Sequence, residues 1–189
     1  MSLVDQIAQA DERALAASGL ACLDRCIPLL GGDDDILRPL WASLVEGHEW
    51  EEQLAKVRAE LGAGVRADAD ADGTFEAEAA GLVRRMLEAI PAQAPADALR
   101  QWADACSVAA LQIHRLLDPA DDETSVAARR EGRTDGMPPL AAAELRRQIT
   151  VLEVVTGHGA AGLRQARDVS TEGRRVLQAV VSRRARGRA

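Results

Sequence analysis

The chain has 189 residues, a net charge of −7 and an apolar fraction of 47%, with no tyrosine and one phenylalanine. This length suits one domain whose core needs neither disulfides nor metals. Alanine, leucine, arginine and glutamate favour helix, whereas the aromatic and β-branched residues that favour strands are scarce. We therefore predict an all-α, single-domain bundle of seven or eight helices, with stacked helical pairs as a natural arrangement.

The cysteine content and the composition of the N-terminal residues indicate the cellular location of the protein. Three cysteines, an odd number, argue against a disulfide framework. The first residues, MSLVDQIAQADER, are acidic where a signal peptide needs a basic region, and no apolar stretch reaches membrane-spanning length. We expect a cytoplasmic protein with reduced thiols and no membrane association.

Two helices are predicted in the first 30 residues. Ser2 is a suitable N-cap for the first, whose apolar pattern continues to a break near Gly19. The second covers Leu20–Leu30 and is closed by Gly31-Gly32.

An acidic turn, Asp33-Asp34-Asp35, precedes the next helix. Carboxylates at a helix start accept hydrogen bonds from free N–H groups and meet the positive end of the helix dipole, which is the favoured interpretation. A site for a cation or a basic partner is the alternative. After Gly47 the apolar phase shifts, which predicts a break and a new helix to about Leu61.

Residues 62–73 form an acidic linker that contains a partial calcium-loop motif. An EF-hand loop has acidic ligands at positions one, three, five and nine, and a bidentate Glu at twelve. Ala79 occupies position twelve here, so a solvated linker is the favoured interpretation and weak calcium binding is the alternative. The acids that match the motif are Asp68, Asp70, Asp72 and Glu76.

Two helices with apolar stripes follow the linker. Thr74 caps the first, and Pro91 ends it. The second spans Pro95–Leu117, and its apolar residues recur at steps of three and four. A helix of about 23 residues is long for a globular protein, so we expect it to be the spine that other helices cover. The expected anchors of the core are Trp41, Trp50 and Trp102.

The C-terminal third alternates loop and helix. Residues 118–137 have no apolar period and predict a long, mobile surface loop. A helix follows and breaks at Gly157-His158-Gly159, and the last helix covers Ala160–Ser182. The helical domain is thus predicted to cover residues 1–182, with 183–189 as a basic disordered tail.

No arrangement typical of an enzyme is present. The spacing of the three histidines matches no metal site, and the three cysteines are interpreted as small core residues. Motifs for phosphate binding, dinucleotide binding or a nucleophilic serine are also missing. We predict neither enzymatic activity nor a cofactor. The histidines and cysteines in question are His48, His114, His158, Cys22, Cys26 and Cys106.

Charge is unevenly distributed along the chain. Residues 1–80 carry 17 acidic and 6 basic side chains, and residues 81–189 carry 13 acidic and 17 basic ones. An arginine-rich C-terminal helix and tail could contact phosphates, but Asp168 and Glu172 interrupt it and stacking aromatics are missing. Binding to nucleic acid is therefore an alternative. Its residues would be Arg174, Arg175, Arg183, Arg184, Arg186 and Arg188.

One segment carries a resemblance to a known family. The run Cys22-Leu23-Asp24-Arg25-Cys26-Ile27-Pro28-Leu29-Leu30, the three aspartates, Arg38 and Trp41 resemble the opening helix pair of small all-helical immunity-type proteins of bacterial polymorphic toxin systems. The resemblance covers residues 20–45. It implies an inhibitor that binds a protein and performs no chemistry, and it assigns no functional residue.

The favoured function is binding of another protein, with homo-oligomerisation left open. An acidic surface attracts basic partners and speeds their association, and a cationic toxin would be one such partner. The expected contact residues are Asp33, Asp34, Asp35, Glu46, Glu49, Glu51 and Glu52.

Overall fold

The computed structural model describes the chain except residues 32–34, 48, 65–73, 94 and 188–189. Over the described residues the protein is an all-α bundle without strands. In chain order its elements are α1 (Leu3–Gln9), α2 (Glu12–Cys26), the 3-10 helix η1 (Ile27–Leu30), α3 (Arg38–Glu46), α4 (Trp50–Gly64), α5 (Phe75–Glu88), α6 (Ala96–Leu117), α7 (Val126–Arg130) and α8 (Pro139–Gly187).

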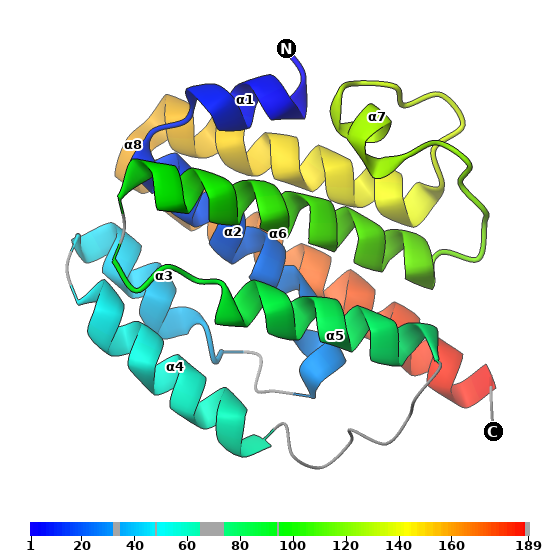
Figure 1. Cartoon of the computed structure of the whole chain (residues 1–189), viewed down its shortest axis with the longest axis horizontal. Coiled ribbons are helices and arrows are strands. Elements are labelled where there is room, and N and C mark those ends of the chain that lie inside the picture. The colour runs from blue at the N-terminus through cyan, green and yellow to red at the C-terminus, as the bar shows by residue number, and fades with distance from the viewer. Residues whose placement is uncertain (32–34, 48, 65–73, 94, 188–189) are drawn as a thin grey trace.

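Helix α2 lies at the centre of the bundle. Every residue from Ala14 to Cys26 is buried, as expected for a helix that is mostly apolar around its whole circumference. Helices α6 and α8 pack along it, and α5 and α6 lie side by side in front of it (Figure 1). The predicted long helix is confirmed as α6, with Pro95 as N-cap. Its predicted role as the covered spine is wrong, because it is α2 that the other helices enclose.

A close approach between α2 and α6 depends on one glycine. A Cβ atom added to Gly19 would lie 2.5 Å from Cζ3 of Trp102. Only a residue without a side chain lets the indole approach α2 this closely, and any larger residue overpacks the contact. Gly19 therefore lies within a helix, whereas the sequence predicted a break there.

The break between the first two helices occurs earlier than predicted. Helix α1 ends at Gln9, and its C-cap Ala10 is extended. Asp11 caps α2 by accepting a hydrogen bond from the backbone N–H of Ala14 at 2.8 Å. Neither glycine nor proline marks this break, so the apolar pattern continued through it. The predicted cap at Ser2 is confirmed, with a reciprocal bond to Asp5.

Helix α8 consists of two halves joined at a kink. Gly159 has φ 55° and ψ −127°, a conformation that side-chain-bearing residues rarely adopt. The predicted break at residues 157–159 is therefore confirmed. In Figure 1 the first half lies behind α6, and the second half crosses behind α2 toward the C-terminus.

Two further expectations need correction. The predicted disordered tail is helical as far as Gly187, because Arg184 donates to Glu76 of α5 at 2.8 Å and fixes the last turns. The predicted loop over residues 118–137 contains α7, whose Arg129 is buried and donates to Asp122 at 2.7 Å. In both places ion pairs between charged side chains contribute to the local structure.

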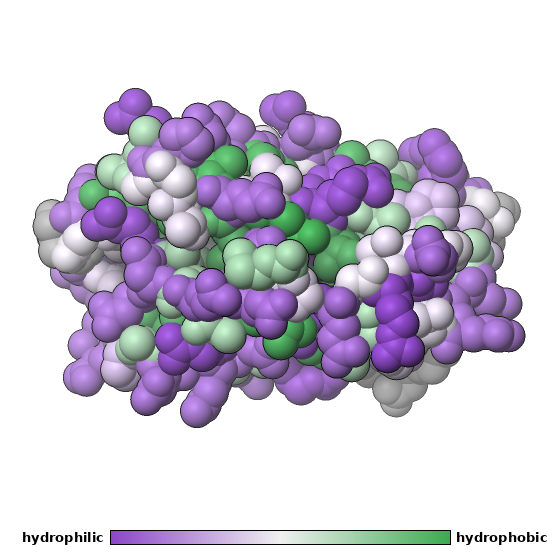
Figure 2. Space-filling view, turned by 90° about the horizontal axis from the view of Figure 1, so that it is seen from above, coloured by the Kyte–Doolittle hydropathy of each residue, from purple (hydrophilic) through white to green (hydrophobic). Residues whose placement is uncertain are grey.

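The surface is largely polar. Figure 2 shows charged and polar side chains over most of the upper face, with hydrophobic atoms in a central band between them. Of the expected anchors, Trp41 and Trp102 are buried, whereas Trp50 is partly exposed. No described helix is both long enough and apolar enough to cross a membrane.

Candidate functional site

The start of α4 borders an open hollow on the protein surface. The hollow has a volume of about 590 Å³ and faces the segment that connects α5 to α6. Its wall on α4 carries three carboxylates around a partly exposed indole, and the facing wall is short and uncharged. Its lining residues are Glu49, Trp50, Glu51, Glu52, Ala55, Ala92 and Gln93.

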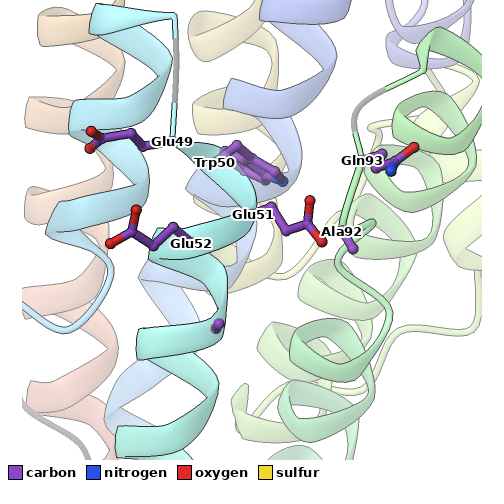
Figure 3. Close-up of a pocket in the computed structure, with 7 residues that line it drawn as sticks. Glu49, Trp50, Glu51, Glu52, Ala92 and Gln93 are labelled. Carbon is purple, nitrogen blue, oxygen red and sulfur yellow. The ribbon is translucent and has the colours of Figure 1, made fainter.

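Figure 3 shows how these side chains point. Glu51 extends across the hollow toward Ala92, whereas Glu49 and Glu52 point away from it to the outer side of α4. Trp50 lies between these two directions, with its indole turned toward the connecting segment. One carboxylate thus lies in the hollow and two lie on the adjoining outer surface of α4, so a partner that approaches this end of α4 meets negative charge first.

Hydrogen bonds hold the two walls of the hollow together. The indole N–H of Trp50 donates to the carbonyl of Pro91 at 2.9 Å. About two helical turns further along α4, Arg58 donates to the carbonyls of Glu88 and Ile90 at 3.0 and 2.8 Å. These carbonyls lie where α5 ends, and the side chains from α4 satisfy groups that a helix end leaves unpaired. The hollow is therefore a fixed feature of the α4–α5 contact.

One carboxylate of this surface is paired with a neighbouring cation. Glu52 accepts a 2.9 Å contact from Lys56, and this hydrogen bond and the ammonium charge lower the pKa of the Glu52 carboxyl. Both side chains are more than half exposed, so the pair is screened by solvent. Lys56 is the only lysine in the chain.

The other predicted contact residues are more dispersed. Glu46 ends α3, one residue before Gly47, which turns the chain with φ 78°. Asp35 lies 3.6 Å from Arg167 of α8, so it faces a different part of the bundle from the hollow. The structure thus brings Glu49, Glu51 and Glu52 together but not Asp35 with them. Asp33 and Asp34 lie outside the described residues.

Asp35 does not cap α3 as predicted for the acidic turn, whose other two aspartates lie outside the described residues. The N-cap of α3 is Leu37, which makes no side-chain hydrogen bond to the helix. The backbone carbonyl of Asp35 accepts a hydrogen bond from the N–H of Arg38 at 2.9 Å. Pro39 in the first turn removes one of the N–H groups that a cap would otherwise satisfy.

A second group of charged residues, which the sequence pattern did not predict, lies inside the bundle. Arg25 of α2 forms a bidentate pair with Glu144 of α8, at 2.7 and 2.6 Å, and both side chains are fully buried. Gln148 donates to Glu144 at 2.8 Å and accepts from Ser107 of α6 at 2.6 Å. We call these four residues, with His114, the interior network.

The interior network has coupled protonation states. Burial alone would raise the pKa of Glu144, but the positive charge and hydrogen bonds of Arg25 hold it below its ordinary value. Burial lowers the pKa of His114, whose Nε2 lies 3.6 Å from Glu144, so the imidazole is neutral at pH 7. Its Nδ1 lies 2.7 Å from the carbonyl of Ala110 and donates to it. The network therefore carries one positive and one negative charge.

Two more buried arginines extend this pattern. Arg174 of α8 donates at 2.7 Å to Asp24, which also accepts from the indole N–H of Trp41 at 3.1 Å. Arg130 of α7 donates to Ser107 at 3.0 Å and to Asp104. With side chains at most 1% exposed, Arg25, Glu144 and His114 hold α2, α6 and α8 together and are closed to substrates in this conformation.

The sequence did contain a signal for the interior network. Glu144 and Gln148 fall on the inward stripe of α8, at helical spacing from Ala141, Val151 and Val155. Polar residues at core positions of an amphipathic pattern are candidates for buried, mutually satisfied groups. Arg25 likewise lies within the apolar run of α2. Helical periodicity does not show that its partner is Glu144, because the two residues are far apart in the sequence.

The cysteines match the prediction. Cys22, Cys26 and Cys106 are buried free thiols. Burial raises the pKa of Cys22 to about 12, and it raises the pKa values of Cys26 and Cys106 well above normal, so none is a thiolate at neutral pH.

The residues of the nucleic-acid alternative are divided between interior and surface. Arg174 is committed to Asp24 and Arg184 to Glu76. Arg175, Arg183 and Arg186 are exposed, and Arg188 lies outside the described residues. Two of the six arginines are thus engaged within the fold and are not presented to a phosphate backbone.

The calcium motif falls mostly outside the described chain. Asp68, Asp70 and Asp72 are not among the described residues, and Glu76 lies in the first turn of α5, paired with Arg184. Within the part of the chain that the structure covers, no group of three or more His, Cys, Asp or Glu side chains is arranged to hold a metal ion.

Comparisons with protein families, with curated proteins and with solved structures give no significant match. The geometry of the chain itself is therefore the basis for a proposed function.

Proposed function

We propose that the protein is a non-enzymatic binding protein that docks a basic segment of another protein at the acidic hollow of α4. The observation that supports this most is the arrangement of Glu49, Glu51 and Glu52 around a partly exposed Trp50 on a hydrogen-bonded base. Exposed carboxylates steer cationic partners, and a tryptophan can receive an arginine or lysine side chain on its ring face.

The size and rigidity of the hollow also suit this role. Its volume of about 590 Å³ accommodates one or two long basic side chains, and the bonds from Trp50 and Arg58 keep its walls in place. A preformed site loses little conformational entropy on binding. In its finer form the proposal is an immunity-type inhibitor whose partner is a cationic toxin, as the resemblance over residues 20–45 implies.

The test reverses the charge of the hollow. The triple variant Glu49→Lys, Glu51→Lys and Glu52→Lys is compared with wild type for association with a synthetic arginine- and lysine-rich peptide. We expect association to slow by about tenfold or more at low salt and to lose most of its salt dependence. Stopped-flow fluorescence of the tryptophans measures the rate.

A matched control changes the net charge equally at another place. The triple variant Asp121→Lys, Glu123→Lys and Asp168→Lys alters three exposed acids outside the hollow. It should retain most of the wild-type rate. Equal slowing in both triple variants would show that only net charge matters and would contradict a site at α4.

A further inference from the structure

A second hollow, independent of the acidic one, lies between α5 and α6. The two helices run side by side at the front of the bundle (Figure 1), and α7 borders the groove between them through Val126. The groove has a volume of about 570 Å³, within the range of small-molecule sites. No residue lines both this groove and the acidic hollow of α4.

The groove exists because small residues separate the two helices. Ala105 and Ala109 of α6 line it together with Ala89, the C-cap residue of α5, and their short side chains leave space that larger residues would fill. Trp102 and Cys106 form its base and are themselves 3% and 0% exposed. The base is thus an apolar and polarizable surface that the core holds rigid.

Apolar side chains also form the rim of the groove. Val108 is 38% exposed, and Leu82 and Val126 are partly buried. Phe75, which is 58% exposed, lies two helical turns before Leu82 on the same stripe of α5. Water in contact with this surface is released when an apolar ligand covers it, and that release favours binding.

The groove carries charge of one sign only, which is positive. Arg85 is the only charged residue among those that line it, and Gln112 is the only other residue with a strongly polar side chain. No hydrogen bond or ion pair joins the guanidinium of Arg85 to another described residue. A ligand that complements the groove therefore has an apolar body and an anionic end.

We propose that this groove binds a small amphipathic carboxylate, such as a medium-chain fatty acid, with its chain between α5 and α6 and its carboxylate at Arg85. A planar carboxylate can accept two hydrogen bonds from a guanidinium, which gives the ligand its orientation. The alanines and Val108 contact the chain without discriminating strongly between aliphatic shapes.

The experiment titrates the full chain with sodium decanoate below its micelle-forming concentration. Isothermal calorimetry measures the affinity, and tryptophan emission, to which Trp102 at the base of the groove contributes, gives a second readout. We expect saturable binding of one decanoate, and binding at least about tenfold weaker for decyltrimethylammonium, which has the same chain and the opposite charge. Decanol, which has no charge, should lie between them.

Variants locate the site. Arg85→Gln should weaken decanoate binding by about threefold to tenfold, as expected for an exposed ion pair, and should leave decanol binding unchanged. Val108→Glu places a like charge at the exposed rim without disturbing the core, and should weaken decanoate further. Ala109→Phe fills the groove and should abolish binding of both probes. Arg164→Gln, an exposed arginine on α8, is the matched control and should bind as wild type does.

Three outcomes would overturn the proposal. These are the lack of saturable decanoate binding by the wild-type chain, equal affinity for decanoate and decyltrimethylammonium, and unchanged decanoate binding by Val108→Glu. Circular dichroism of each variant shows whether its helices are intact, and Val108→Glu keeps the test decisive if Ala109→Phe does not fold.

Discussion

Glu144 and Glu51 are the same residue type in opposite surroundings. Glu144 is fully buried, and Arg25, Gln148 and His114 surround its carboxylate. Glu51 extends from α4 across an open hollow toward an uncharged wall. The buried carboxylate has been removed from water and must keep its partners, because an unpaired buried charge is very unfavourable. The exposed one retains its hydration and is available to a partner.

The comparison extends to the whole molecule. Interior charges join elements that are far apart in sequence, such as α2 with α8, and so help to specify which helices are neighbours. Surface charges near α4 contribute little to that choice. Substitutions in the two groups should therefore change different properties. Those in the interior group should change the stability of the fold, and those in the surface group should change association with a partner.

The largest effect is expected from Glu144→Gln. The amide keeps the shape but leaves the buried Arg25 guanidinium without its counter-charge, so unfolding should become easier by about 3–5 kcal/mol. The midpoint of urea denaturation, followed by circular dichroism, measures this change. A double variant, Arg25→Met with Glu144→Leu, removes both charges and should recover much of the loss. If the double variant were less stable than Glu144→Gln, the penalty would not arise from an unpaired charge.

Two adjacent arginines of α8 allow an interior and a surface charge to be compared directly. Arg174→Gln breaks the bond to buried Asp24 and should cost about 1.5–3 kcal/mol. Arg175→Gln alters an exposed residue one position later and should stay within about 0.5 kcal/mol of wild type. Thermal unfolding of the two variants side by side provides the measurement. Similar losses at both positions would contradict the division between the two groups.

This division also explains which parts of the structure the sequence predicted. The bounds of α6, the cap at Thr74, the buried cysteines and the break at Gly159 follow from local signals, namely helical periodicity, capping residues and glycine. The break at Ala10 and the helical end at Gly187 lack such signals. The second of these depends on Arg184 meeting Glu76, a contact between distant segments that no local pattern encodes.

The candidate site was predicted only in part, for the same reason. The cluster of Glu49, Glu51 and Glu52 is local in sequence and appears in the structure as one surface. The opposite wall at Ala92 and Gln93, and the hydrogen bond from Trp50 to Pro91, join segments about 40 residues apart. The interior network could not be predicted from the sequence, because each of its members, taken alone, has no feature that distinguishes it from an exposed polar residue.

The pH dependence of stability sharpens the comparison further. Burial lowers the pKa of His114 in the folded state, so the unfolded chain binds a proton more readily as pH falls below the ordinary histidine value near 6.5. Stability should thus decrease from pH 7 toward pH 5, and decrease again near pH 4.5 and below, where Glu144 gains a proton on unfolding. Urea midpoints across this range measure it. In His114→Gln the urea midpoint should change little with pH above pH 5 and should still fall at more acidic pH. If its dependence on pH were the same as in wild type, the loss of stability above pH 5 would come from groups other than His114.

The smallest effect on stability is expected at the acidic hollow itself. Glu49→Gln, Glu51→Gln and Glu52→Gln together change the net charge from −7 to about −4 and remove the exposed contact of Glu52 with Lys56. Because these groups are hydrated, their loss should leave the urea midpoint unchanged within error. The same variant should weaken the salt dependence of association with the basic peptide, since steering depends on charge at the mouth of the hollow. A large fall in the midpoint would show that these carboxylates hold α4 in place, and then the contrast between a structural interior and an available surface would not hold for this protein.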